Sequence, residues 1–152
     1  MHMDYLIQLL MAYLGSLGFG GLYNLHGRKL QFAAVGGFLA WGVYLLINQL
    51  TPSPYPCAFV SSVALTLYSE LMARWHKTPV TIFLVTSAIP LIPGAGLYRC
   101  VSALMLKDIE RATDQGMYAL FFAASMAAGI TLTTLFFRMM LSHWYGYKRK
   151  RA

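Results

Sequence analysis

Long runs of apolar residues are the feature that most limits the folds open to this chain. Residues 5–23 and 30–50 form two such runs, and Gln8 is the only polar interruption of the first before its end. A helix needs roughly 20 apolar residues to cross the hydrocarbon core of a bilayer. Both runs therefore predict transmembrane helices and an all-α polytopic membrane protein.

Three further spans complete this prediction. A proline-rich loop at residues 51–56 precedes a third span at 57–72. Residues 79–106 form a fourth span that is too long and too interrupted to be one plain helix. A fifth span is expected at 116–141, after a loop of mixed charge, with a basic cytoplasmic tail at 142–152.

The composition supports a membrane environment over an aqueous one. Hydrophobic residues make up 58% of the chain and charged residues 11%, whereas soluble domains carry about 25% charged residues. A soluble domain of this length buries only about 70% of its unfolded surface, so much of this apolar surface would remain in water. We expect residues 1–152 to form a single transmembrane domain in a lipid bilayer.

The positions of the basic residues predict the orientation. An external N-terminus leaves eight Lys and Arg residues in the inner loops and tail, against two in the outer loops. Cytoplasmic loops carry the excess of Lys and Arg in membrane proteins. We therefore expect the N-terminus outside and the C-terminus in the cytoplasm. The net charge of +7 then fits attraction of the basic segments to the anionic cytoplasmic leaflet, and no nucleic-acid partner is expected.

The fourth span contains a motif that should break its helix. Pro90 and Pro93 lack the backbone N–H, and Gly94 and Gly96 follow them closely. Irregular backbone at membrane depth is tolerated only where protein or a watery cavity surrounds it. A helix restarting near Gly94, Ala95 and Gly96 would point free, partially positive amides into the break.

Arg99 lies about one turn beyond this break. Backbone donors beside a guanidinium form a candidate site for a carboxylate, and transporters commonly bind anionic groups at discontinuous helices. The sequence leaves an alternative open, in which Arg99 reaches the outer interface and the prolines only kink the span.

Three other polar residues are candidates for coupling or gating. Glu70 and Arg74 have the i, i+4 spacing of an ion pair, and a simple interfacial pair is the favoured interpretation. The alternative is that Glu70 is a buried coupling carboxylate. Asn24 either bonds across helices or caps the first one.

No pattern predicts catalysis. The four histidines lack the spacing of a zinc pair. The chain has no Gly-x-Ser-x-Gly motif, and its Pro-Gly-Ala-Gly segment lacks the Lys-Ser/Thr ending of a phosphate loop. We expect no enzyme, no catalytic residues, no metal and no cofactor.

Small residues form faces on the first, second and fifth spans, as in Ala119, Ala123 and Ala127. Such faces permit close helix packing. They fit internal packing, contact with another subunit, or both, and an oligomer is expected.

The segment from Pro90 to Arg99, PLIPGAGLYR, resembles a signature of the threonine/serine exporter family, Pro-x-aliphatic-Pro-Gly-x-x-x-Tyr-Arg. Glu70 to Arg74, ELMAR, and the segment ending at Asn24 are also similar, in the same order along the chain. The chain looks like the small membrane subunit of the split, two-component form, similar to the succinate-exporter small subunit.

This resemblance implies a multi-pass protein of the bacterial inner membrane that exports small carboxylates such as succinate, threonine or serine. It implies a larger partner subunit with a soluble N-terminal region. Pro90, Pro93, Gly94, Tyr98 and Arg99 match the family pattern and are expected at the substrate. A structural or assembly subunit without a transport role is the alternative, and a channel is a third possibility.

Overall fold

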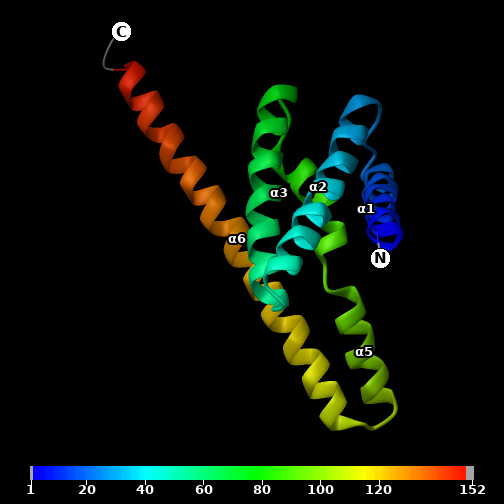
Figure 1. Ribbon diagram of the computed structural model, residues 1–152. Coiled ribbons are helices and arrows are strands. Elements are labelled where there is room, and N and C mark those ends of the chain that lie inside the picture. The colour runs from blue at the N-terminus through cyan, green and yellow to red at the C-terminus, as the bar shows by residue number, and fades with distance from the viewer. Residues whose placement is uncertain (1, 150–152) are drawn as a thin grey trace.

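The structure, a computed structural model, describes the backbone of residues 2–149 and the side chains of residues 3–140. Its regular elements over these residues are helices (Figure 1). In chain order they are α1 (His2–Leu22), α2 (Arg28–Leu50), α3 (Pro54–His76), α4 (Val80–Ala88), the short 3₁₀ helix η1 (Ile89–Leu91), α5 (Gly94–Met105) and α6 (Ile109–Arg149).

The predicted fold class is confirmed. In the described part of the chain, four helices are long and apolar enough to cross a membrane, namely α1, α2, α3 and the segment Ile109–Met140 of α6. The segments Val80–Leu91 and Gly94–Met105 pass the same test together and are bent by 55°. Counting this bent pair as one broken span gives five.

The proline-rich loop is shorter than predicted. α3 begins at Pro54, so Pro54 and Pro56 belong to its first turn. Amides in the first turn of a helix have no intrahelical acceptor, and proline therefore fits there without loss of a hydrogen bond. The prediction of a loop across all three prolines was wrong for the last two.

The charged loop before the last span is also shorter than predicted, because α6 begins at Ile109. The side chain of Asp108 accepts a hydrogen bond from the amide of Arg111 at 3.1 Å, which caps the new helix. At its other end α6 continues to Arg149. The backbone of the expected tail is thus helical from 142 to 149.

Helices α1 to α4 form a closely packed group around α2. Adding a Cβ to Gly36 would bring it into Ser87 of α4, and adding one to Gly37 would bring it into Ser16 of α1. The hydroxyl of Ser87 donates to the carbonyl of Ala33 at 2.8 Å. Internal packing therefore accounts for the small-residue face of α2.

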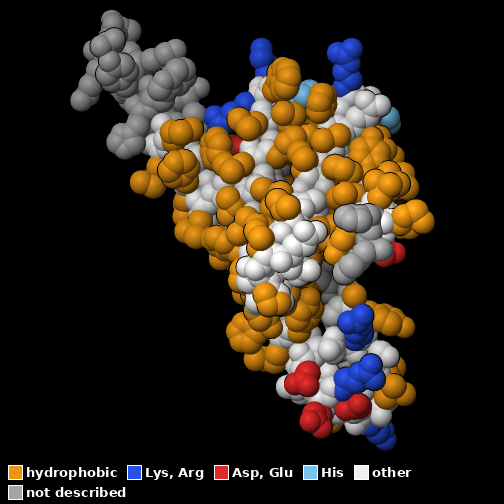
Figure 2. Space-filling model, in the orientation of Figure 1, with side chains coloured by type: hydrophobic (Ala, Val, Ile, Leu, Met, Phe, Trp, Pro, Cys, Tyr) orange, Lys and Arg blue, Asp and Glu red, His pale blue; other side chains and the backbone are white. Residues whose placement is uncertain are grey.

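The bend after η1 directs α5 away from this group (Figure 1). α5 makes its extensive contacts with α6 alone, and α6 continues past it to pack along α3. Lys and Arg gather at the end of the molecule opposite the α5–α6 hairpin, whereas both signs of charge meet at the hairpin tip (Figure 2). The break therefore sits where the helix group ends and the hairpin begins.

Candidate cavity at the broken helix

The predicted break in the fourth span is confirmed at Ile92 and Pro93. Ile92 has an extended ψ of 128°, and its amide donates to Ile89 at 3.3 Å. The helical pattern resumes when the amide of Leu97 donates to the carbonyl of Pro93 at 3.1 Å. Gly94, Ala95 and Gly96 form the first turn of α5 and not the irregular segment itself.

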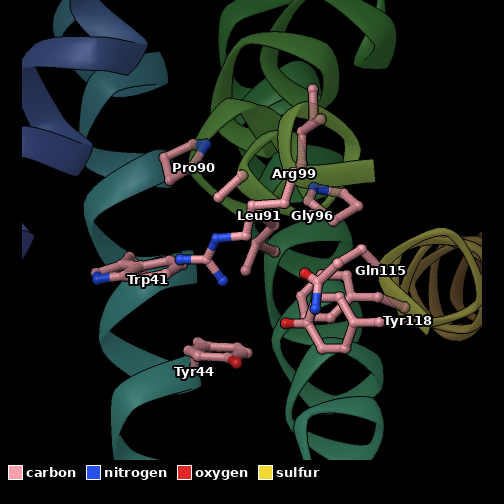
Figure 3. Close-up of a pocket in the computed structure, with 12 residues that line it drawn as sticks. Trp41, Tyr44, Pro90, Leu91, Gly96, Arg99, Gln115 and Tyr118 are labelled. Carbon is pink, nitrogen blue, oxygen red and sulfur yellow. The ribbon is translucent and has the colours of Figure 1, made fainter. Parts of the chain in front are cut away.

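A cavity of about 440 Å³ lies against this break (Figure 3). Four elements supply its walls, since α2, η1, α5 and α6 all contribute side chains. Its lining residues are Trp41, Tyr44, Pro90, Leu91, Ile92, Pro93, Ala95, Gly96, Arg99, Gln115, Tyr118 and Phe122.

Arg99 is the only charged residue in this lining. Its side chain leaves α5 and directs the guanidinium toward Trp41 of α2, with Tyr44 nearby (Figure 3). Within the described residues the guanidinium makes no hydrogen bond or ion pair. A positive group with five donors is thus left available to a ligand.

The structure brings Pro90, Pro93, Ala95 and Gly96 to the same cavity as Arg99. Gly94 and Tyr98 are not among its lining residues. The amide of Gly94 donates to the carbonyl of Ile92 at 2.7 Å, which removes it as a donor for a ligand. Tyr98 is 75% exposed, on a part of α5 outside the cavity wall.

Sequence reasoning missed an aromatic wall in this cavity. Trp41 and Tyr44 stack with ring centroids 4.9 Å apart, and Tyr44 and Phe122 lie at 6.1 Å. Tyr118 continues the wall at 6.0 Å from Phe122. The rings come from α2 and α6, so the sequence showed only the i, i+3 pair within α2 and the i, i+4 pair within α6, and not that the two pairs meet.

Gln115 was also missed, although it lies one turn before Tyr118 on the cavity face of α6. Both side chains are half-buried. Figure 3 shows them on the side of the cavity across from the tip of Arg99. The predicted fifth span began at 116, directly after Gln115, so the sequence did not assign Gln115 to a helix face.

Trp41 also lines a second cavity, of about 360 Å³. The second cavity is lined by Trp41 and Pro90 as well, together with residues of α1 that include Gln8. The indole Nε1–H of Trp41 donates to Oε1 of Gln8 at 3.2 Å. The donor of Trp41 is therefore already occupied by protein.

Glu70 and Arg74 form the predicted ion pair, with Arg74 Nη2 at 3.0 Å from Glu70 Oε2. Glu70 is buried, while the side chain of Arg74 is 39% exposed. The guanidinium of Arg74 also lies 5.3 Å above the ring of Phe137 of α6. The ion pair lies within α3, and the contact of Arg74 with Phe137 joins α3 to α6. Neither Glu70 nor Arg74 lines the cavity.

Asn24 serves as a helix cap. It has a positive φ of 59°, and its amide donates to Gly21 at 3.0 Å while that of Leu25 donates to Gly20 at 3.0 Å. These two bonds form a Schellman motif at the end of α1. In the part of the chain that the structure describes, no group of His, Cys, Asp and Glu could hold a metal ion.

Comparison with known families gives one match that covers most of the chain. Residues 8–136 match the profile described as "Threonine/Serine exporter, ThrE". This range includes every residue that lines the cavity. No solved structure matches the chain.

Proposed function

This chain belongs to the threonine/serine exporter family, and from that premise we propose that it is one subunit of an exporter for small carboxylated metabolites. The substrate is threonine or serine, or a dicarboxylate such as succinate. A larger membrane subunit with a soluble N-terminal region completes the exporter.

One observation carries this proposal: the unpaired guanidinium of Arg99 lies in a cavity beside a broken membrane helix. The family match names carboxylated substrates, and a guanidinium binds a carboxylate through two parallel hydrogen bonds. Ala95 and Gly96, in the first turn of α5, add amides at the positive end of a helix dipole. Substrate carboxylate, Arg99 and these amides together form the proposed binding site.

Glu70 has a separate role in this proposal, as a gating or coupling group. It is a buried carboxylate that forms an ion pair with Arg74 within α3, and the guanidinium of Arg74 lies over Phe137 in the second half of α6. Loss of the ion pair would free Arg74 from its position over Phe137. Motion of α6 would then reach the cavity, because Gln115, Tyr118 and Phe122 lie on the same helix.

The proposed location is the bacterial inner membrane, with the N-terminus outside. The exposed apolar surface of the α5–α6 hairpin is the observation that favours a partner subunit. Leu97, Val101 and Leu104 of α5 are each more than half exposed, and α5 has extensive contacts only with α6. This surface needs lipid or a partner helix to cover it.

Replacing Arg99 tests the proposal. We expect Arg99→Gln to lower efflux from cells that contain both subunits by more than about tenfold, because one charge-assisted bond is worth roughly 1.5–3 kcal/mol. Arg111→Gln is the matched control, since Arg111 is exposed on the same hairpin and outside the cavity. Efflux that is normal in Arg99→Gln, at equal membrane abundance, would remove Arg99 from the mechanism.

The second candidate function is a structural or assembly subunit, which the exposed surface of α5 favours. In that case, changes at Leu97 or Val101 would prevent co-purification of the larger subunit. Arg99→Gln would then leave both efflux and assembly unchanged. Measuring efflux and co-purification for the same variants separates the two functions.

A further inference from the structure

The cavity has two chemically different ends. One end is the guanidinium of Arg99, and the other is formed by Gln115 and Tyr118 of α6 (Figure 3). Gln115, Tyr118 and Phe122 have i, i+3, i+7 spacing and so share one face of the helix. A small molecule held by Arg99 would therefore present its far end to α6.

The polar groups at this far end have no hydrogen-bond partner among residues 3–140. Among the residues whose side chains are described, neither the amide of Gln115 nor the hydroxyl of Tyr118 makes a hydrogen bond. Trp41 differs, because it donates to Gln8. An amide carries two donors and one acceptor oxygen, and leaving these unmatched in a half-buried, mostly apolar site is unfavourable unless a ligand or water binds them.

The charge of the lining limits what the far end can hold. Arg99 balances one carboxylate, and the lining contains no second basic residue and no acidic one. A second carboxylate at Gln115 would keep its negative charge without a counter-ion, which is costly away from water. It would also face the negatively polarised faces of Tyr118 and Phe122.

A hydroxyl or an ammonium group avoids that cost. The Gln115 amide can both donate to and accept from a hydroxyl. An ammonium can donate to the Gln115 oxygen and lie over an aromatic face, an arrangement that is attractive for a cation. Both groups match the neutral, aromatic character of this end of the cavity.

We propose that Gln115 is the specificity-determining residue of the cavity, binding the second polar group of the substrate and favouring a hydroxyl or an ammonium over a second carboxylate. This inference rests on the proposed function, because it requires a carboxylate bound at Arg99. It separates the two substrate classes that the proposed function names together.

The test compares three acids in vesicles that contain the assembled exporter: serine, succinate and propionate, which has one carboxylate and no second polar group. The wild-type exporter is expected to have a lower KM for serine than for succinate. Gln115→Leu should raise the KM for serine about tenfold and leave that for propionate unchanged. Gln115→Lys adds a positive charge and should shift the KM ratio toward succinate by at least about tenfold.

Thr113→Val is the matched control, because Thr113 is exposed on the same helix and outside the cavity. The inference is overturned if the wild type prefers succinate, or if Gln115→Leu changes serine and propionate alike. If Gln115→Lys does not accumulate in the membrane, the comparison of KM values between Gln115→Leu and Thr113→Val still tests the inference. Arg99→Gln distinguishes failure of this inference from failure of the proposed function. If Arg99→Gln abolishes transport of all three acids while the Gln115 variants leave the KM ratios unchanged, the proposed function is retained and this inference is rejected.

Discussion

Individual glycines set how closely the helices approach one another. Gly37 of α2 lies against Ser16 of α1, and Pro90 Cγ would lie 3.3 Å from an added Cβ at this glycine. A Cβ added to Gly18 of α1 would have no atom within 4 Å. The two glycines therefore differ sharply in what a methyl group would meet.

We expect Gly37→Ala to destabilise the protein by about 1–3 kcal/mol, the usual cost of overpacking. Gly18→Ala should be neutral or slightly stabilising, because alanine favours the helical state over glycine. Thermal unfolding of the detergent-purified protein, followed by tryptophan fluorescence, measures both. Equal stability of the two variants would contradict the close contact between α1 and α2.

The buried carboxylate of Glu70 gives a second prediction. Glu70→Gln should lower stability by about 1–2 kcal/mol, less than for a fully buried pair, because Arg74 is 39% exposed. Glu110→Gln, at an exposed position in the first turn of α6, is the control. If Glu70→Gln and Arg74→Gln are additive in the double variant, the ion pair contributes no coupling.

Residues of the candidate site differed in how far the sequence revealed them. Arg99, Pro90 and Pro93 were predictable because they lie together in one short motif with an unusual composition. Gln115, Tyr44 and Tyr118 were not, because they come from α2 and α6 and are brought to the motif only by packing. Nothing in a single helix indicates which neighbouring helix it will face.

Among the elements, the broken fourth span carries the most specific structural prediction. The double variant Pro90→Ala/Pro93→Ala restores two backbone N–H donors between α4 and α5. It also removes two proline rings that would clash with the backbone of a continuous helix. The double variant should straighten the 55° bend, narrow the cavity and reduce efflux.

Spin labels at the exposed positions Val85 of α4 and Leu104 of α5 would measure this change as a longer, narrower distance distribution. Pro54→Ala is the control, because Pro54 lies in the first turn of α3, where no intrahelical hydrogen bond is missing. An unchanged distance in the double variant would mean that packing against α6, and not the prolines, fixes the bend.

The same contrast explains which element boundaries were predictable. Pro54 and Pro93 both stand where a helix begins. Pro93 marks a break in a span because the helical segment η1 ends two residues before it, whereas Pro54 follows a loop. A charged segment can likewise be a loop or a helix start. The charged segment before the last span is a helix start, because the side chain of Asp108 caps α6 by accepting a hydrogen bond from the amide of Arg111.

At the scale of the whole molecule, the arrangement of the helices was not predictable from hydrophobic pattern. In a bilayer, faces that meet lipid are as apolar as faces that meet protein. Only 17% of the most apolar part of the span in α1 and 22% of that in α6 is buried within the protein, so hydrophobicity does not mark which of their faces pack against other helices. The projecting α5–α6 hairpin follows from the bend and from contacts between distant segments.

The distribution of charge over the whole molecule predicts its orientation. The α1–α2 and α3–α4 connections lie at one end with Arg28, Lys29 and Lys77, and Figure 2 shows basic side chains gathered at that end. The α2–α3 connection and the hairpin tip lie toward the other. The end of a membrane protein that carries the excess of Lys and Arg is normally the cytoplasmic end.

Single cysteines test this orientation in a variant that lacks Cys57 and Cys100. Pro52→Cys and Leu106→Cys should react with an impermeant maleimide on intact cells, because both lie at the proposed outer end and are exposed. His26→Cys, exposed at the basic end, should react only after the membrane is permeabilised. The reverse labelling would place the N-terminus in the cytoplasm and the tip of the α5–α6 hairpin on the cytoplasmic side.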